Sequence, residues 1–499
     1  MRLSDRRLLD GLLPGLALAG LGLAYATTLA PGVTWANDAA DSGDLITAAA
    51  TLGVAHPPGY PTYLLLARLC QLIPLGDLAW RTTLLSALAA ALAAAVAARI
   101  VRDLLADRSW RAAVAALLAA LALGLAPVVW SQAVVAEVYA LNALLTAALL
   151  RFSLQSSRAA GQPAPPATWA DRLRALVAGL ALGNHLTIAL LVVLWLVAIA
   201  AHAPRGTRLR AFRSRLAWVG AGLLVYLYLP LRAAAHPPVN WGDPHDWEGF
   251  WWTVSGQAYR ELAFGLPPGL LPGRVTAWAG LLVGQFGWAG LALGCFGLLY
   301  GTASSRWFIW LSAAAAAAYS AFAIAYNTAD SYAYLIPAYL IFAIWIGLGT
   351  HRLLGLVEAR SRRGAVLVAI GLAGLLAWPI PATARQVDAS QDRRAIAFAT
   401  RVLAAAPHGA IVITASDRDT FPLWYYHYAL GQRSDIAVVV APLLDFAWYR
   451  ENLRAVYPQL QIPKHPDRPW IETLAALNGG LGRICRTDAN SDRVLTCGG

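Results

Sequence analysis

The sequence predicts an all-α polytopic membrane protein with about 11 membrane segments, followed by a small C-terminal α/β domain. The 499 residues are 58% hydrophobic and only 13% charged, with a mean hydropathy of +0.53. Soluble domains carry about 45–50% apolar and about 25% charged residues. Here the apolar excess lies in runs close to the roughly 20 residues of a spanning helix. The formal charge of +12 comes mainly from arginine clusters between these runs, which indicate topology, so we expect no nucleic-acid partner.

The first predicted span covers residues 9–30 and follows three arginines, which places the N-terminus in the cytoplasm. We expect this segment to remain as an anchor. Residues 31–80 and 232–274 form outer loops. Residues 44–74, which include the short apolar stretch 59–74 with Arg68, are interpreted as interfacial or re-entrant helices on the outer side. The other predicted single spans are 81–99, 112–129, 134–150, 216–231, 276–300, 306–325, 333–350 and 364–381.

A helical hairpin is predicted for residues 175–201, because arginine clusters lie on both sides of this segment. A single crossing would place one cluster outside. The sequence Gly183-Asn184-His185 is the expected break. Irregular backbone at membrane depth is tolerated where it lines a cavity, so this break is a candidate part of a binding site.

The chain therefore divides into a membrane domain, residues 1–381, and a small α/β domain, residues 382–499, that lies outside. Two buried strands are expected at 410–414 and 436–440. Cys485 and Cys497 could pair in an oxidising periplasm or remain free thiols. The helical stretches expected in this domain are 393–406, 421–430 and 445–456.

Three carboxylates, Asp38, Asp41 and Asp44, follow the first span directly. A carboxylate at the outer membrane face can accept a proton from an acceptor hydroxyl or bind a metal. The alternatives are that these acids are simply solvated, or that Asp44 caps the following helix. The stretch Ala55-His-Pro-Pro-Gly-Tyr-Pro61 comes next and belongs to the same outer loop.

These residues resemble a signature found in bacterial polytopic membrane proteins of the GT-C class, related to the animal protein O-mannosyltransferases. The family pattern reads Asp-Ser-Gly-Glu, then Ala-His-Pro-Pro-Gly-Tyr-Pro. The resemblance extends over almost the whole chain. The matching stretches are 41–49, 52–61, Leu182-Gly-Asn-His-Leu-Thr187, Asn240-Trp-Gly-Asp-Pro244 and Asp417-Arg-Asp-Thr-Phe-Pro-Leu-Trp-Tyr425.

The resemblance implies a GT-C fold and an inverting transfer of a sugar, with mannose suggested by the animal members. The donor would be a polyprenyl-phosphate-linked sugar, and the acceptor a hydroxyl of a protein or envelope glycan. Asp41 would be the general base. Asp44 stands where the family has Glu and is the second catalytic candidate, whereas Asp38 lies outside the pattern. The chemistry requires no cofactor, although a divalent metal could assist.

Arg232 is the first choice for the donor phosphate and Arg260 the second, because a guanidinium stays charged and binds phosphate through two N–H groups. The alternative for Arg232 is an interaction with lipid headgroups. His56 and His185 are candidate substrate contacts, although a lone histidine is often structural.

The other candidate substrate-binding residues are the remaining polar and aromatic members of the motifs. Trp241 is equally well explained as part of an interfacial aromatic belt. The short loop around Asp330 could approach the same cavity, and Asp417 with Asp419 could be structural or acceptor-binding. The motif residues are Tyr60, Asn184, Asn240, Trp241 and Asp243.

The sequence thus favours a periplasm-facing glycosyltransferase in a bacterial inner membrane. A transporter or flippase of lipid-linked glycans is the alternative. A transporter should carry charges along its spans, and Glu137 is the main acid of this kind, whereas most acids gather at the outer face.

Overall fold

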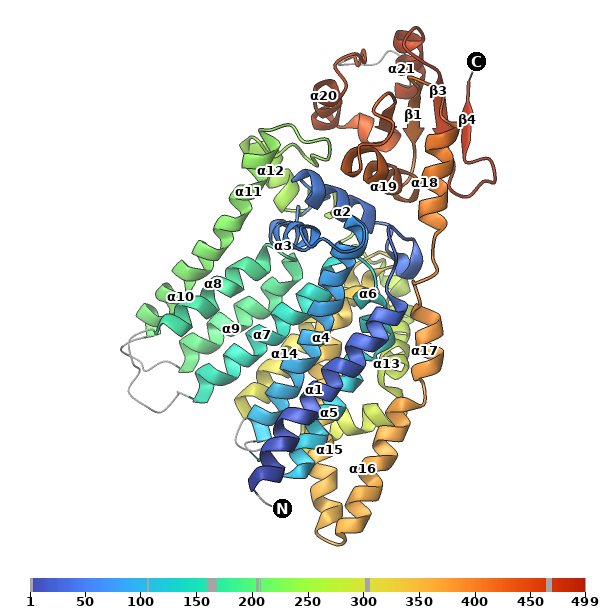
Figure 1. Cartoon of the computed structure of the whole chain (residues 1–499). Helices are drawn as coiled ribbons and strands as arrows, with labels where there is room; N and C mark the ends of the chain where they lie inside the picture. The colour runs from blue at the N-terminus through green and yellow to red at the C-terminus, as the bar shows by residue number, and fades with distance from the viewer. Residues whose placement is uncertain are drawn as a thin grey trace.

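The computed structural model describes residues 3–105, 107–158, 168–202, 206, 208–300, 306–463 and 469–498. A bundle of long helices makes up most of the molecule, and an α/β domain sits on one end of it (Figure 1). Arg2 and Arg205, two of the arginines used to orient the spans, lie outside the described residues.

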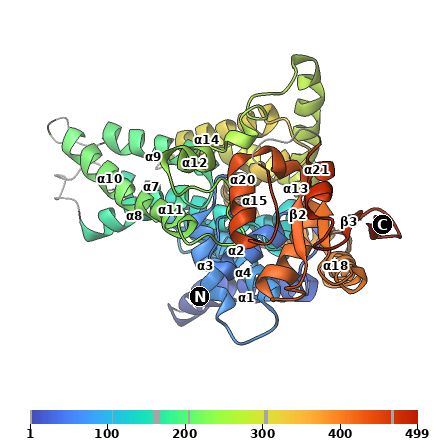
Figure 2. The same ribbon diagram turned by 90° about the horizontal axis from the view of Figure 1, so that it is seen from above.

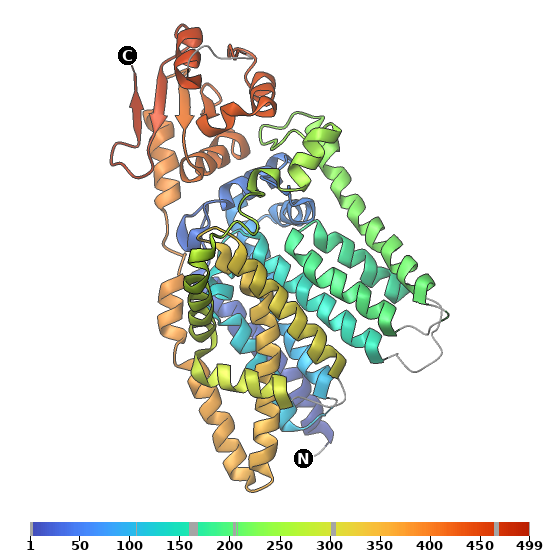
Figure 3. The same ribbon diagram turned by 180° about the vertical axis from the view of Figure 1, so that it is seen from behind.

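The centre of the bundle is formed by α1 (Leu3–Thr28), α4 (Leu78–Leu105), α5 (Trp110–Gly124), α7 (Val138–Arg158) and α15 (Ile336–Glu358). Helix α15 is buried along most of its length. Helices α8 (Trp169–Leu182), α9 (Ala189–His202) and α10 (Arg208–Leu223) form one flank. Helices α13 (Leu271–Tyr300), α14 (Arg306–Ala325) and α16 (Arg362–Ala377) pack against α15, and α14 also contacts α9 (Figure 3).

Small residues allow these helices to pack closely. A Cβ built on Gly179 of α8 would lie 2.1 Å from the carbonyl oxygen of Val219 in α10. Gly297 of α13 and Gly349 of α15 make an equally close backbone contact. Contacts of this kind are typical of helices in membranes, where burial from water does not drive association. Figure 3 also shows a sharp bend in α13, at Gly287, whose φ of 62° suits glycine.

Six of the described helices are long and apolar enough to cross a membrane. A seventh candidate is α5 together with α6 (Pro127–Ala133), which are bent by 67°. Three shorter apolar helices lie at Gly15–Thr28, Val138–Leu154 and Leu186–Ala198. The multi-pass character of the protein is therefore confirmed. Each predicted span falls on a helix, but 11 crossings remain a prediction.

Two short helices of the first loop, α2 (Ser42–Thr51) and α3 (Pro61–Gln71), lie at the end of the bundle beneath the α/β domain (Figure 1). Neither is among the candidate spans. This placement agrees with the prediction of interfacial helices. Helices α11 (Tyr228–Ala233) and α12 (Trp247–Val254) lie at the same end.

The predicted break at 183–185 is confirmed. Helix α8 ends at Leu182, and a 3-10 turn, η2 (Leu186–Ile188), precedes α9. Side chains from neighbouring helices satisfy the carbonyl groups at the end of α8: Thr62 Oγ1 donates to Leu180 O at 2.7 Å, and the Tyr226 hydroxyl donates to Leu182 O at 2.9 Å. The break is therefore held in a defined conformation.

The α/β domain contains a four-stranded sheet of order β2-β1-β3-β4. Both predicted strands are confirmed as β1 (Ile411–Thr414) and β2 (Ala437–Val440), which pair in parallel. The predicted helices correspond to α18 (Arg394–Ala405), α19 (Asp417–Trp424) continued by η8 (Tyr425–Ala429), and α20 (Ala447–Val456). The sequence analysis missed α21 (Trp470–Asn478), β3 (Ile484–Thr487) and β4 (Leu495–Cys497).

A disulfide joins Cys485 to Cys497 across the antiparallel pair β3 and β4, which decides between the two alternatives for these cysteines. The predicted domain boundary at 381/382 falls inside α17 (Ile380–Val387), a helix that leads from the bundle towards the domain (Figure 1). Seen from above, the domain covers part of the end of the bundle and leaves α8, α9 and α10 uncovered (Figure 2).

Candidate active site

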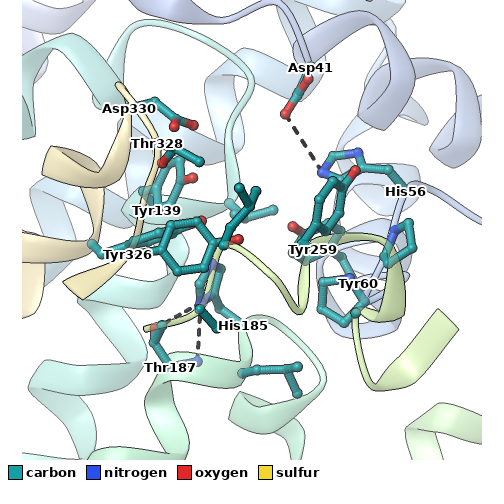
Figure 4. A pocket seen from close by; sticks show the side chains of 18 of the residues that line it. Asp41, His56, Tyr60, Tyr139, His185, Thr187, Tyr259, Tyr326, Thr328 and Asp330 are labelled. Carbon is teal, nitrogen blue, oxygen red and sulfur yellow. Dashed lines mark hydrogen bonds and ion pairs between the residues drawn. The ribbon is translucent and has the colours of Figure 1, made fainter. Parts of the chain in front are cut away.

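A cavity of about 510 Å³ lies where the first loop, the end of the bundle and the α/β domain meet. Six of the predicted site residues line it, and Figure 4 shows several of them around the open space. These six are Asp41, His56, Tyr60, His185, Trp241 and Arg260. The sequence motifs, although far apart along the chain, therefore converge on one cavity.

His56 connects the two aspartates of the first motif. Its Nδ1 lies 2.7 Å from Asp44 Oδ2, and its Nε2 lies 3.7 Å from Asp41 Oδ2 (Figure 4). The Asp44 carboxylate is completely buried and accepts two more hydrogen bonds, from the His56 amide at 3.0 Å and from Trp241 Nε1 at 3.1 Å. The Asp41 side chain is 44% exposed and faces the cavity. Asp44 therefore holds His56, and Asp41 is the carboxylate that a substrate can reach.

These charges influence one another. Burial alone would lower the pKa of His56, but Asp41 and Asp44 outweigh it and raise this pKa to about 9. Burial raises the pKa of Asp41; Asp44 and Asp330 add to the rise, and His56 opposes it. His56 is therefore positively charged at neutral pH, beside a carboxylate that is a stronger base than an exposed aspartate.

Backbone pairing brings the Asn240–Pro244 motif to the first loop. Residues Val54 and Asn240 form a parallel bridge, and the Trp241 amide donates to Val54 O at 3.1 Å. Because of this pairing, the indole of Trp241 reaches Asp44. Asn240 and Asp243 do not line the cavity: Asn240 Nδ2 donates to Asp243 Oδ1 at 2.8 Å, and Asp243 Oδ2 lies 3.0 Å from His245 Nδ1. These two residues shape the loop.

The helix break places His185 on the floor of the cavity. Its Nδ1 accepts a hydrogen bond from the Thr187 amide at 3.3 Å and lies 2.8 Å from the Thr187 hydroxyl. With Nδ1 as acceptor, the neutral ring carries its proton on Nε2 as a donor. The rings of Tyr60, Tyr139 and Tyr334 lie 6.2, 5.7 and 5.6 Å from that of His185. The floor is therefore aromatic, with one ring N–H donor among its groups.

Two further predicted residues lie outside the cavity lining. Arg232, the first choice for the phosphate, donates from Nε to Leu52 O at 2.7 Å and so fastens α11 to the turn after α2. Asn184 is fully buried, with Nδ2 at 3.4 Å from Val138 O. Arg260 does line the cavity, is exposed, and donates from Nη2 to Ser255 Oγ at 3.1 Å. Of the two arginines predicted for the phosphate, Arg260 is therefore the one that lines the cavity.

Several lining residues lie outside the predicted site set. Asp330 lines the cavity, as the sequence analysis expected of its loop. Glu137, which the sequence singled out only as an acid within a span that would suit a transporter, also lines the cavity. The tyrosines had no distinguishing signal, because aromatic residues are common at both ends of membrane helices. The lining residues of these kinds are Glu137, Tyr139, Tyr259, Tyr326, Asp330, Tyr334 and Asp417.

The α/β domain supplies part of the cavity wall through Asp417 and Phe421 of α19. Helix α19 packs directly on α2: a Cβ built on Gly43 would lie 2.6 Å from the carbonyl oxygen of Phe421. Only glycine allows this approach, which gives a physical reason for the Gly in the Asp-Ser-Gly motif. Among the described residues, no group of three or more His, Cys, Asp or Glu side chains is arranged to hold a metal ion.

The fold and the cavity define a multi-pass membrane protein with a catalytic-type site at one end of its helix bundle. Comparison with known proteins adds a family relation. Residues 41–206 match the family described as "Protein O-mannosyl-transferase TMEM260 N-terminal domain", and residues 395–466 match "TMEM260-associated domain 2". The two matched ranges contain Asp41 and Asp417, which both line the cavity.

Curated relatives carry the same name. The chain is 27% identical over 489 residues to Protein O-mannosyl-transferase TMEM260 of Mus musculus, covering 88% of this chain and 64% of that protein. It is 23% identical over 526 residues to the Dictyostelium discoideum protein of that name, covering 95% of this chain and 62% of the relative. The chain therefore spans less than two thirds of the length of these relatives.

Solved structures share the fold. ArnT from Cupriavidus metallidurans bound to undecaprenyl phosphate is 14% identical, with a TM-score of 0.53 over 87% of this chain and 90% of ArnT. The Archaeoglobus fulgidus oligosaccharyltransferase in complex with Zn and sulfate is 13% identical, with a TM-score of 0.53 over 94% of this chain and 68% of that chain. The expected GT-C-type fold of the membrane domain is thereby confirmed.

Proposed function

We propose that the protein is a membrane glycosyltransferase that moves mannose from a polyprenyl-phosphate-linked donor to a hydroxyl group of a protein. The observation that carries this proposal is the Asp41 carboxylate, which faces the cavity beside the charged His56–Asp44 pair, 3.7 Å from His56 Nε2. The names of the relatives support the sugar and the class of acceptor.

The reaction requires a base and a group that stabilises the leaving phosphate. Asp41 takes the proton from the acceptor hydroxyl as its oxygen bonds to the sugar C1. The bond between C1 and the phosphate oxygen breaks on the opposite side, so the configuration at C1 inverts. The electron pair leaves with the polyprenyl phosphate, whose added charge lies beside Arg260. His56 and Asp44 hold Asp41 in place, and the step requires no cofactor.

The aromatic floor suits a sugar, because tyrosine rings pack on its C–H faces and the His185 N–H can donate to a hydroxyl. We assign the reaction to the periplasmic side of a bacterial inner membrane, with the N-terminus in the cytoplasm. The α/β domain and the cavity then lie on the same, outer side.

The test is a transfer assay with the purified protein, polyprenyl-phosphate mannose and serine- or threonine-containing peptides. Asp41→Asn should reduce turnover by about 10²–10⁴-fold, because it removes the base and nearly preserves side-chain volume. Asp38→Asn is the matched control: Asp38 lies three residues earlier, accepts a hydrogen bond from the Tyr332 hydroxyl and does not line the cavity.

Normal turnover in Asp41→Asn would remove Asp41 from the mechanism. Absence of transfer by the wild type, together with movement of labelled donor lipid across vesicles, would instead support a flippase.

A further inference from the structure

The cavity has two sides of different character. The floor is formed by His185, Tyr139 and Tyr334, which come from the ends of membrane helices and the turns between them. The opposite wall is formed by Asp417 and Phe421, from the domain that lies beyond the bundle (Figure 1). A donor whose polyprenyl tail remains in the bilayer reaches the cavity from the helices. An acceptor protein arrives from the aqueous side, where α19 lies.

Residues of the Asp417-Arg418-Asp419 sequence have different roles. The Arg418 guanidinium lies 4.6 Å from the centre of the Trp35 ring and thereby links the domain to the first loop. Asp419 is buried and accepts a hydrogen bond from the Ala489 amide at 2.9 Å. Asp417 is exposed, and its carboxylate makes no hydrogen bond or ion pair with any residue that the structure describes. An acid at 417 suits the first turn of α19, but no side chain that the structure describes in the domain requires its carboxylate as a partner.

The charges around Asp417 also exclude a role in holding the donor phosphate. The acids Asp41 and Asp330 line the same cavity. Of the lining residues that the structure describes, Arg260 is the one arginine. A phosphate beside Asp417 would be repelled by its carboxylate, and the charged His56 of the same cavity is already paired with Asp44 and Asp41. A positively charged group would be attracted by Asp417.

We propose that Asp417 is a specificity-determining residue that favours acceptor segments with Lys or Arg next to the modified hydroxyl over segments with Asp or Glu there. This inference rests on the proposed function and assigns part of acceptor recognition to the α/β domain. The preference is electrostatic, and the Asp417 carboxylate is exposed to solvent. Dissolved ions screen such a charge, so the preference should weaken as the salt concentration rises.

The test uses the full-length protein, polyprenyl-phosphate mannose, and three peptides that differ only in Lys, Ala or Glu beside one threonine. For the wild type we expect kcat/KM to be about tenfold higher for the Lys peptide than for the Glu peptide, the effect of one close charge pair near a protein surface. Asp417→Asn should reduce this ratio to about two, with the donor KM unchanged. Asp417→Glu, which keeps the charge, should retain most of the preference.

Asp492→Asn is the matched control, because Asp492 is an exposed acid of the same domain that does not line the cavity. Its ratio should equal that of the wild type. An unchanged ratio in Asp417→Asn, or a wild type that uses the three peptides equally, would overturn the inference and leave the transferase intact. Absence of transfer to every peptide would overturn the proposed function, and this inference with it.

Discussion

The two ends of the helix bundle each contain a histidine–aspartate pair, but the charges around the two pairs differ. At the end opposite the cavity, His351 Nε2 lies 3.0 Å from Asp107 Oδ2, and Arg111 pairs with Glu358 at 3.0 Å. At the cavity end, His56 pairs with Asp44, while Asp41, Asp330 and Asp417 line open space. Acids at the first end are neutralised by partners, whereas acids at the second end remain available to a ligand.

The pKa shifts follow this difference. Burial would raise the pKa of Asp107, but hydrogen bonds from Ser109 and His351 outweigh it and lower this pKa to about 2. Asp417 is exposed to the cavity, and partial desolvation by the surrounding walls raises its pKa to about 6, with a further contribution from Asp41. Hydrogen bonds and positive partners stabilise the ionised carboxylate, lower its pKa and make it a weaker base. A desolvated carboxylate without such partners has a raised pKa and is a stronger base. The comparison therefore indicates that the carboxylates available for reaction lie at the cavity end, and that the ion pairs at the other end stabilise the fold.

The largest expected difference between the two ends is in turnover. His56→Gln should reduce transfer by about 100-fold, because Asp41 loses the cation that positions it. His351→Gln should leave kcat and KM unchanged and lower the thermal midpoint. Kinetics and thermal unfolding of both variants provide the measurement. A comparable loss of turnover in His351→Gln would contradict the division between the two ends.

A smaller effect should separate the two arginines at the cavity end. Arg260→Ala is expected to raise the donor KM by about tenfold, because a charge-assisted contact to phosphate is lost. Arg232→Ala should leave the donor KM unchanged and reduce stability, since its Nε bonds to Leu52 O. Donor titrations at saturating acceptor measure both. If the donor KM instead rises in Arg232→Ala alone, the first sequence-based choice was right.

The smallest expected effect is on stability at alkaline pH. The pKa of His56 is raised to about 9 from an ordinary value of 6.5. Its contribution to stability is therefore fully present below pH 6.5 and is lost as the pH rises through about 9. We expect about 1 kcal/mol of destabilisation, discounted because Asp41 is partly exposed. Thermal midpoints between pH 7 and 10 should fall more for the wild type than for His56→Gln, and parallel curves would argue against the ion pair.

The sequence was most informative where a pattern is local. Apolar length identified the spans, and the break at 183–185 was visible as a polar triplet inside an apolar run. The first motif gave Asp41, His56 and Tyr60 as site residues. Asp44 was also found, but only the structure distinguishes it from Asp41, because burial depends on the indole of Trp241, which approaches from a distant loop.

The rest depends on how distant segments meet. Arg232 and Arg260 have the same chemistry and flank the same outer loop, so the sequence could not show which one turns into the cavity. The tyrosines of the floor come from different helices and turns, and no local spacing links them. Strands β3 and β4 are short and half exposed, so they lack the continuous apolar run that revealed β1 and β2.

The close approach of Gly43 to Phe421 also has a consequence for the order of synthesis. Asp41 is made early, near the first apolar segment, whereas the wall that completes its cavity is made several hundred residues later. At about 5–20 residues per second, tens of seconds separate the two. Until α19 docks on α2, the newly made helices hold an unfinished cavity. A reaction that needs the complete cavity can therefore begin only after the α/β domain has been made and has docked.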